Sequence, residues 1–307
     1  DVDVGHAGQG TGANPPGTLN AVSDDVRWLG LRPTLTDPVL VVMLNGWIDA
    51  GGASRAAMAA IEDESDTTPF VEFDDDAYID FRARRPTMEL RDGLHTVLQW
   101  ERILLSAGTD RTGRDLLLLS GPEPDMAWHR FVGEVAGLAE QLGVVQMAHF
   151  GSYPFAVPHT RPARISVTTP SEDVLARVPF LRSSIDVPAG VAAVLEAELY
   201  ARDIPTIGIW AQVPHYIASL TYPAASVALL DALREATGLV IEAPDLRAEV
   251  HLHVERLNAL IEGNDEHVGM LHQLERIYDA SADSVEVEGA APIAPTLELK
   301  SGDELAA

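Results

Sequence analysis

Short apolar runs alternate along the chain with longer stretches of helical spacing. Strand patterns lie at 39–44, 70–73, 115–120, 144–150, 164–169 and 206–213, and 164–169 is rich in β-branched residues. The continuous apolar run at 115–120 is typical of a strand covered on both faces. Apolar residues recur every three or four positions at 53–61, 128–142, 189–202 and 222–237. Strand, helix and strand in this order imply parallel pairing through right-handed crossovers. The pattern therefore predicts an α/β layered domain with a mostly parallel central sheet.

Two regions depart from this alternation. Residues 78–92 are polar and rich in arginine, so we predict a loop there, followed by a weakly alternating strand over 95–105. From 244 to 280 the pattern is wholly helical, with a break at Gly263-Asn264-Asp265. Two antiparallel helices that serve as an interaction element are the simplest interpretation of that break.

The ends of the chain lack apolar periodicity. Residues 1–24 contain many Gly, Pro, Asn and Thr residues, and 281–307 are acidic and rich in Pro and Ala. We therefore expect a flexible N-terminal arm (1–24), an α/β core (25–243), a helical hairpin (244–280) and a disordered acidic tail (281–307).

Composition excludes several classes of protein. The 307 residues contain no cysteine, which removes disulfides, thiolate catalysis and cysteine-ligated metal sites. The net charge is −26, and a surface of that sign repels phosphate backbones and anionic lipid. No apolar run reaches about 18 residues, and the first residues do not form a secretory signal. We therefore expect a cytoplasmic protein that binds neither nucleic acid nor membrane.

The segment Leu40–Met58 is the first candidate site, because a buried strand there ends in a glycine-bearing turn before a helix. Such turns, at the carboxyl ends of parallel strands, are where α/β proteins usually place their sites. The spacing matches neither a phosphate-binding loop nor a dinucleotide fingerprint. Asp49 as a cap of the following helix is the favoured interpretation, with a ligand site as the alternative.

Other strand-end loops carry polar residues that could converge on that turn. If a pocket exists, we expect it to be lined by Asn45, Trp47, Asp49, Gly51, Tyr153, His159 and His215. A hydrogen-bonded interior or rim position is the favoured interpretation for each histidine, as it is for His149. Glu123 and Asp125 are interpreted as first-turn acids of the next helix. The arginines at 82, 84 and 85 are interpreted as a solvated basic loop.

No catalytic signature is present. The histidines lack metal-ligand spacing, and no serine has the exposed Gly-x-Ser-x-Gly setting of a nucleophile. We therefore expect no metal and no cofactor, name no catalytic residue, and favour a protein that is not an enzyme.

Three stretches resemble one family when they are taken together. They are Gly46-Trp-Ile-Asp-Ala-Gly-Gly-Ala53, Leu119-Ser-Gly-Pro-Glu-Pro-Asp-Met-Ala-Trp-His-Arg-Phe131 and Gly151-Ser-Tyr-Pro-Phe-Ala-Val-Pro-His-Thr-Arg-Pro162. With the helical end, they resemble actinobacterial members of the proteasome assembly chaperone 2 family over about residues 25–280. The resemblance implies a three-layer α/β/α fold of phosphorylase/hydrolase-like architecture. It also implies a homo-oligomer, such as a trimer, with a proteasome-related protein partner.

Related archaeal proteins dock on the proteasome through a C-terminal tripeptide of a hydrophobic residue, tyrosine and any residue. This chain ends Glu304-Leu-Ala-Ala307, so we do not expect docking by that route. Two hypotheses follow for the function. One is a protein-interaction or assembly factor, and the other is a small-molecule binder or hydrolase/phosphorylase-like enzyme with a pocket at the strand-end loops.

Overall fold

The computed structural model describes residues 25–281 and 286–287. The arm expected at 1–24 lies outside the described residues. So does the expected tail, apart from Ser281 and the short strand Glu286–Val287 (β12), which pairs with β10 (Arg182–Ser183).

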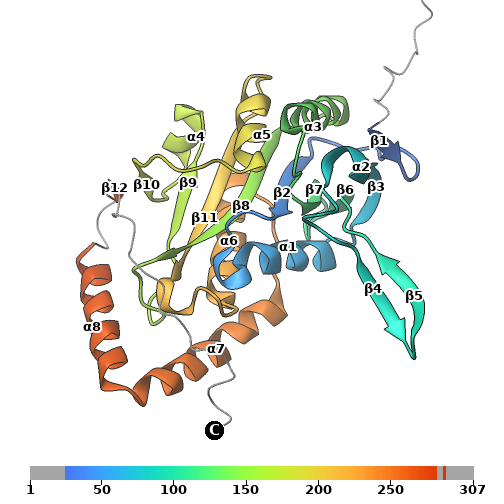
Figure 1. Ribbon diagram of the computed structural model, residues 1–307. Coiled ribbons are helices and arrows are strands. Elements are labelled where there is room, and N and C mark those ends of the chain that lie inside the picture. The colour runs from blue at the N-terminus through green and yellow to red at the C-terminus, as the bar shows by residue number, and fades with distance from the viewer. Residues whose placement is uncertain (1–24, 282–285, 288–307) are drawn as a thin grey trace, which may run out of the picture.

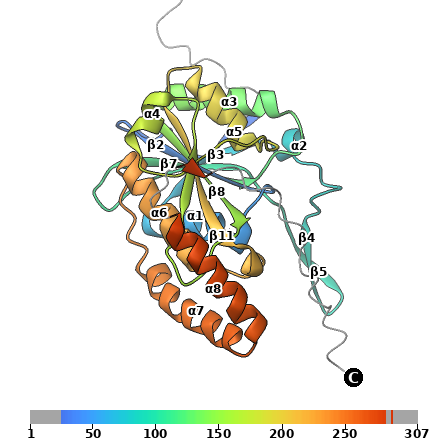
Figure 2. The ribbon, with the colours of Figure 1, turned by 90° about the vertical axis from the view of Figure 1, so that its left-hand side faces the viewer.

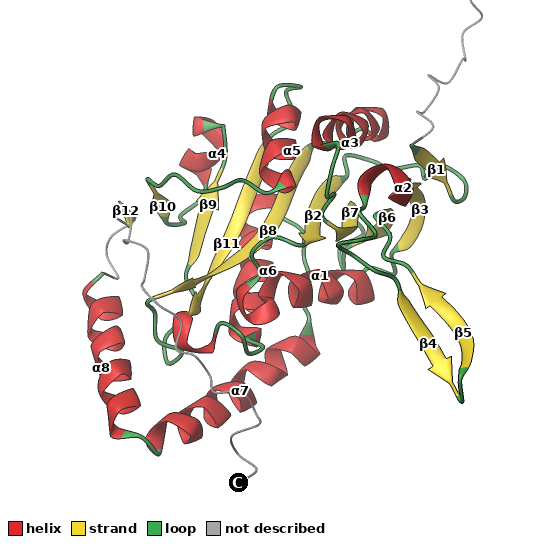
Figure 3. Cartoon of the chain, viewed as in Figure 1, coloured by secondary structure: helices red, strands yellow, loops and turns green. Residues whose placement is uncertain are grey.

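An eight-stranded mixed sheet forms the centre of the described chain, in the order β1-β3-β6-β7-β2-β8-β11-β9 (Figures 1 and 3). The strands are β1 (Val26–Trp28), β2 (Val39–Asn45), β3 (Thr68–Phe73), β6 (Leu104–Thr109), β7 (Asp115–Pro122), β8 (Gln146–Phe155), β9 (Ile165–Thr168) and β11 (Thr206–Pro214).

The predicted parallel pairing holds only at the centre of this sheet. The pairs β7–β2, β2–β8 and β8–β11 are parallel, whereas β1–β3, β3–β6, β6–β7 and β11–β9 are antiparallel. The connections explain the difference. A tight turn joins β6 to β7, with Asp110 accepting hydrogen bonds from the amides of Thr112 and Arg114. A turn this short can join only antiparallel neighbours. The prediction of a mostly parallel sheet was therefore wrong for its outer strands.

Helices cover both faces of the sheet (Figures 1 and 2). Helices α1 (Ala53–Glu64) and α6 (Pro223–Thr237) lie on one face, and α3 (Trp128–Leu142) and α5 (Val191–Tyr200) lie on the other. Alternate residues of β2 enter two separate hydrophobic cores, with Val39 and Val41 in one and Leu40 and Val42 in the other. Burial on both faces is why this strand is continuously apolar in the sequence.

Local signals set several helix ends. Helix α3 ends at Gly143, whose φ of 73° is easily adopted by glycine, and α6 ends in the same way at Gly238. The Ser171 hydroxyl caps α4 (Glu172–Arg177) by accepting a hydrogen bond from the amide of Val174, as the sequence predicts. Helix α2 (Asp75–Tyr78) is a single turn capped by Asp74.

A helix pair at the C-terminal end is confirmed, but its two helices meet at an open angle and do not lie side by side as the predicted antiparallel pair (Figure 1). Helices α7 (Pro244–Glu262) and α8 (Asp265–Ala280) meet at the expected break, where the Asn264 side chain accepts hydrogen bonds from two amides of α8. Only Leu257 and Ile261 of α7, and Leu271 and Leu274 of α8, are buried. None of the described helices is long and apolar enough to span a membrane.

The predicted loop at 78–92 was wrong in its second half, because a two-stranded ribbon projects there from the body (Figure 2). It consists of β4 (Thr87–Arg91) and β5 (Leu94–Gln99), and we call it the β4–β5 ribbon. Its tip is Asp92-Gly93, with φ values of 51° and 80°. An Asp-Gly pair in this conformation makes a type I′-like hairpin turn. A bulge between Glu89 and Leu90 weakens the alternation that would have predicted the strands.

Candidate functional site

The turn after β2 is built around Asp49. Its Oδ1 accepts hydrogen bonds from the Ser54 amide (2.8 Å) and from the Ser152 hydroxyl (2.9 Å), and Oδ2 lies 3.4 Å from the Arg55 amide nitrogen. Amide donors of this kind are the otherwise unpaired N–H groups of a helix start. The carboxylate therefore joins the start of α1 to strand β8.

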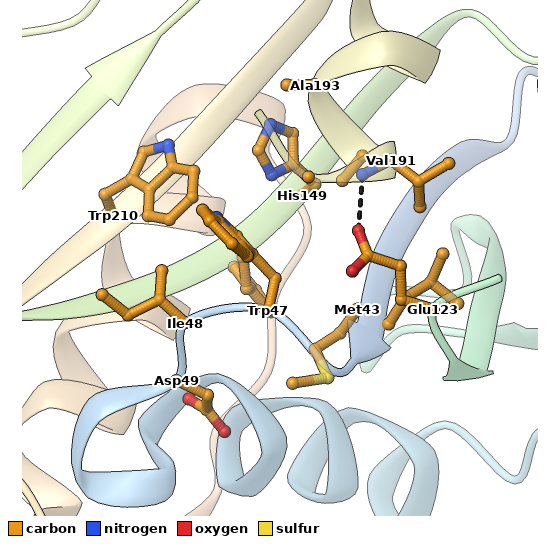
Figure 4. Close-up of a pocket in the computed structure, with 13 residues that line it drawn as sticks. Met43, Trp47, Ile48, Asp49, Glu123, His149, Val191, Ala193 and Trp210 are labelled. Atoms are coloured by element: carbon orange, nitrogen blue, oxygen red, sulfur yellow. Dashed lines mark hydrogen bonds between the residues drawn. The ribbon is translucent and has the colours of Figure 1, made fainter. Parts of the chain in front are cut away.

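A small hollow lies beside this turn, and we call it the strand-end hollow (Figure 4). Its volume is about 30 Å³, whereas pockets for metabolites usually measure about 300–1,000 Å³. Space of this size holds one or two waters or the head of one side chain. The hollow lies where β2, β8 and β11 meet the start of α5 and the end of β7. Its lining residues are Met43, Leu44, Trp47, Ile48, Asp49, Glu123, His149, Phe150, Gly190, Val191, Ala192, Ala193 and Trp210.

Glu123 is the buried acid of the strand-end hollow. It follows β7, it is 8% exposed, and its Oε1 accepts a hydrogen bond of 2.6 Å from the Val191 amide. Val191 is the first residue of α5, so Glu123 caps that helix and not α3, the helix that follows it in the chain. The interpretation of Glu123 as a first-turn acid of the next helix was therefore wrong.

A second polar group connects the sheet to α5. His149 Nε2 and Glu196 Oε2 are 2.7 Å apart and both side chains are buried. The Thr168 hydroxyl lies 3.4 Å from the same Glu196 oxygen and 3.3 Å from Trp210 Nε1. Buried polar groups need such partners, because an unpaired one costs free energy.

Two glycines make room for the rings of this group. A Cβ on Gly208 would lie 2.5 Å from the His149 ring, and one on Gly151 would lie 2.2 Å from the Trp210 ring. Real Cβ atoms do not approach other atoms so closely, so both strand positions favour glycine.

The structure brings together only part of the set predicted from sequence. Trp47 and Asp49 line the strand-end hollow, and Asn45 lies nearby in the turn, where its Oδ1 accepts a hydrogen bond from Arg55 Nε at 3.2 Å. Gly51 is buried in the turn, with its amide donating to the Ala218 carbonyl.

The other three predicted residues lie elsewhere. The Tyr153 hydroxyl lies 3.0 Å from the Ser166 hydroxyl. His159 and His215 both pack edge-on against Tyr216, at ring-centroid distances of 6.0 and 5.5 Å. They form a separate group that does not line the strand-end hollow.

His159 links this separate group to α7. Its Nδ1 is 2.7 Å from the Tyr216 hydroxyl and its Nε2 is 3.0 Å from Asn258 Oδ1. Burial lowers the pKa of His159, although the Asn258 hydrogen bond and the Glu275 charge act in the opposite direction. Burial also raises the pKa of Tyr216 to about 12. Both groups are therefore neutral near pH 7, and their role here is to hold α7 on the sheet.

Sequence reasoning did not single out Glu196 and Trp210. One signal was present, since Glu196 is a charged residue on a helix whose other buried residues are apolar (Val191, Leu195 and Leu199). Its partner His149 lies 47 positions away, so only the fold could pair them.

The strand-end hollow is lined by two carboxylates, one imidazole, aromatic rings and apolar side chains. None of its described lining residues carries a hydroxyl or amine nucleophile. The described residues also contain no group of three His, Cys, Asp or Glu residues that could hold a metal ion. The strand-end hollow offers a ligand aromatic walls, one buried carboxylate and the start of a helix.

Comparisons with known proteins agree with this fold. A protein of unknown function from Mycobacterium tuberculosis is 32% identical, with a TM-score of 0.78 over 84% of this chain and 92% of its own. A protein of unknown function from Corynebacterium glutamicum is 28% identical, with a TM-score of 0.79 over 84% of this chain and 98% of its own. A proteasome-assembly chaperone homologue from M. tuberculosis is 29% identical, with a TM-score of 0.71 over 77% of this chain and 99% of its own.

No curated protein matches the chain. The PAC2 family matches residues 43–261, which run from the end of β2 through the strand-end turn to α7. These findings confirm the resemblance seen in the three sequence stretches. The chain belongs to the PAC2 family.

Proposed function

We propose that the protein is a non-enzymatic protein-interaction or assembly factor that works as a homo-oligomer with a proteasome-related partner. Membership of the family supports a proteasome-related partner, since one relative is described as a proteasome-assembly chaperone homologue. The small strand-end hollow supports a role in recognition over one in metabolite chemistry. In this proposal residues 25–243 form the α/β core, and residues 244–280 form the helix pair that serves as an interaction element.

The main observation in favour of protein interaction is the exposed apolar face of the β4–β5 ribbon. Met88 and Leu98 pair across the two strands, and with Leu90 and Trp100 they follow one face by strand alternation. These side chains are 41–51% exposed. The opposite face carries Glu89, which contacts Arg91 and Gln99, and Val97, which pairs with Glu89 and is 45% exposed. An isolated two-stranded ribbon is marginal in water, so one with an apolar face calls for a covering surface.

Charge favours a second copy of the chain as that covering surface. Residues 81–102 hold five arginines and three acids, although the whole chain has a net charge of −26. This basic charge lies at the base of the ribbon, because residues 87–99 carry one arginine against two acids. Arg84 and Arg102 pair within the chain with Asp125 and Glu72, so Arg82 and Arg85 are the charges that the acidic described body of another copy would complement. A ribbon that contacts a different surface on its neighbour makes a head-to-tail contact. Such a contact gives a ring where the rotation between neighbours closes, and a trimer is a small ring of this type.

Sedimentation equilibrium of matched variants tests the self-association. We expect Leu98→Asn to shift the wild-type oligomer to monomers at micromolar concentration, because it places an amide in the apolar face. Val97→Asn changes the adjacent residue on the opposite face and keeps the oligomer. Equal behaviour of the two variants, or a monomeric wild-type chain, contradicts the proposal.

Binding to purified α and β subunits of an actinobacterial proteasome tests whether the partner is proteasome-related. Immobilised wild-type chain is expected to capture at least one subunit in biolayer interferometry, or to change the rate of ring formation on native gels. An oligomeric chain that does neither refutes the proteasome-related partner.

A second candidate function is a small-molecule binder or phosphorylase-like enzyme. The buried His149–Glu196 pair beside the strand-end hollow is the observation that favours it, because such a pair can orient a ligand or move a proton. A thermal-shift screen with metabolites tests it. A hit must raise the melting temperature of the wild type and leave that of His149→Gln unchanged, each compared with its own ligand-free value.

A further inference from the structure

Among the residues that the structure describes, only one carboxylate oxygen of Glu123 has a protein partner. Its Oε1 bonds the Val191 amide, and Figure 4 shows the other oxygen directed into the strand-end hollow towards Trp47. Within the described part of the chain, no cation lies at ion-pair distance from Glu123. The neighbouring Arg84 is paired with Asp125 at 3.0 Å. A carboxylate that is 8% exposed and lacks a cation is costly unless another group compensates its charge.

Two indoles line the same hollow: Trp47 lies on the side of Glu123, and Trp210 lies beyond it (Figure 4). Trp47 is 44% exposed and packs on Gly190, where a Cβ would lie 3.1 Å from its ring. Trp210 is held by the Thr168 hydroxyl and lies edge-on to His149 at 5.7 Å. The face of an indole is electronegative and attracts cations within about 6 Å.

The walls and size of the strand-end hollow further restrict the ligand. Met43, Ile48 and Val191 give it apolar walls, which suit the methylene stem of a long side chain. Its volume of about 30 Å³ admits a head group but not a whole metabolite.

We propose that the strand-end hollow binds the cationic head of one lysine or arginine side chain from a partner protein. Glu123 is the counter-ion, and Trp47 and Trp210 are the aromatic walls. The inference rests on the proposed protein-interaction function and names the chemistry that the partner presents, which is a basic residue on a segment that reaches the carboxyl ends of the central strands. The competing explanation is that Glu123 serves only to cap α5.

Fluorine NMR of the full chain labelled with 5-fluorotryptophan tests this directly. The chain has five tryptophans, so single Trp→Phe variants assign the five resonances. The probes are N-acetyl-lysine amide, N-acetyl-arginine amide and, as the uncharged control, N-acetyl-norleucine amide. We expect a saturable shift of the Trp47 and Trp210 resonances with at least one cationic probe and none with norleucine. The tighter of the two cationic probes identifies the head group.

Matched variants separate charge recognition from capping. Glu123→Gln keeps an oxygen that accepts from the Val191 amide but removes the charge, so we expect a melting temperature no lower than that of the wild type and about tenfold weaker probe binding. Trp47→Leu is expected to weaken binding roughly fivefold through loss of the cation–π contact. Glu235→Gln on α6 removes one charge outside the hollow and leaves binding unchanged.

Three results overturn the inference: no shift at Trp47 and Trp210 with either cationic probe, equal binding of norleucine, or undiminished binding to Glu123→Gln. Failure here is distinct from failure of the proposed function. A chain that captures a proteasome subunit but ignores the cationic probes keeps its function and loses only this site.

Discussion

At the scale of single residues, two acids at helix starts differ in how completely they are bonded. Both oxygens of Asp49 face donors, on α1 and on Ser152. In the described chain, Glu123 has a protein donor on one oxygen only. We therefore assign Asp49 a role in stability, and Glu123 a role in both stability and recognition.

Asp49→Ala is expected to lower the free energy of unfolding by about 1–2 kcal/mol, because it removes the acceptor for two donors. Urea denaturation followed by circular dichroism measures the loss. Asp63→Ala, at an exposed position near the end of the same helix, is the control and is expected to change little. Equal midpoints for the two variants would show that Asp49 does not cap α1.

Sequence distance explains which of these roles could be predicted. Asp49 lies five residues before Ser54, so its capping role is local and visible in the sequence. Glu123 and Val191 are 68 residues apart, and His149 and Glu196 are 47 apart. Their pairing depends on strand order and helix placement, which residue patterns alone do not fix.

His159 is expected to make stability depend on pH. Its pKa is lowered in the folded state from an ordinary value of 6.5, so the unfolded chain holds more protons just below pH 6.5. Stability is therefore fully present above about pH 7 and falls as the pH falls through the folded pKa. His253, whose pKa is lowered by burial and by Arg256, acts with the same sign.

Urea midpoints between about pH 5 and pH 7.5 check this slope. His159→Gln is expected to reduce it without abolishing it, because His253 remains. His95→Gln, on the exposed ribbon, should leave it unchanged. A slope equal to that of the wild type in His159→Gln would rule out this histidine as the source.

At the scale of elements, apolar periodicity predicted the strands and helices that bury residues in the core. It did not predict the elements that bury none. The central strands and α7–α8 were predicted because their apolar residues are buried at regular spacing. The β4–β5 ribbon has no buried residue, so burial did not select its pattern, and a bulge interrupts the alternation. Its Asp92-Gly93 turn was the remaining sequence signal for a hairpin.

Strand β8 also differs from the prediction. It runs to Phe155, through part of the predicted loop at 151–158, because β11 pairs along it to that point.

Helix α8 depends on polar contacts more than on burial. Arg161 binds Glu275 at 3.1 Å and Asp279 at 2.8 Å, and these bonds raise the pKa of Arg161. The Arg164 guanidinium lies 3.6 Å from the centre of the Tyr278 ring. The loop between β8 and β9 therefore holds the far end of the helix pair.

Arg161→Gln is expected to speed hydrogen exchange of the α8 amides several-fold and to leave the central strands unchanged. Local openings of this kind are independent of global unfolding. Arg276→Gln removes the same charge from an exposed position on α8 and serves as the control. Equal protection of α8 in both variants would assign its docking to Leu271 and Leu274 alone.

At the scale of the whole molecule, the excess of 47 acidic over 21 basic residues acts in two opposite ways. Like charges repel one another in the compact state, which lowers stability. The same field attracts a basic partner to the strand-end hollow and raises the rate of encounter. Salt weakens both effects, because the screening length falls from about 30 Å at 0.01 M to about 8 Å at 0.15 M.

Added sodium chloride is therefore expected to move folding and recognition in opposite directions. Over this range the melting temperature should rise by roughly 2–4 °C, since about 1 kcal/mol of relieved repulsion gives a shift of that size in a chain this long. Affinity for the tighter cationic probe should fall over the same range. Sucrose, which is uncharged, strengthens burial without screening and should leave probe affinity unchanged. A melting temperature that falls with salt would mean that ion pairs such as those of Arg161 outweigh the general repulsion. Probe affinity that is insensitive to salt would mean that Glu123 is not the counter-ion.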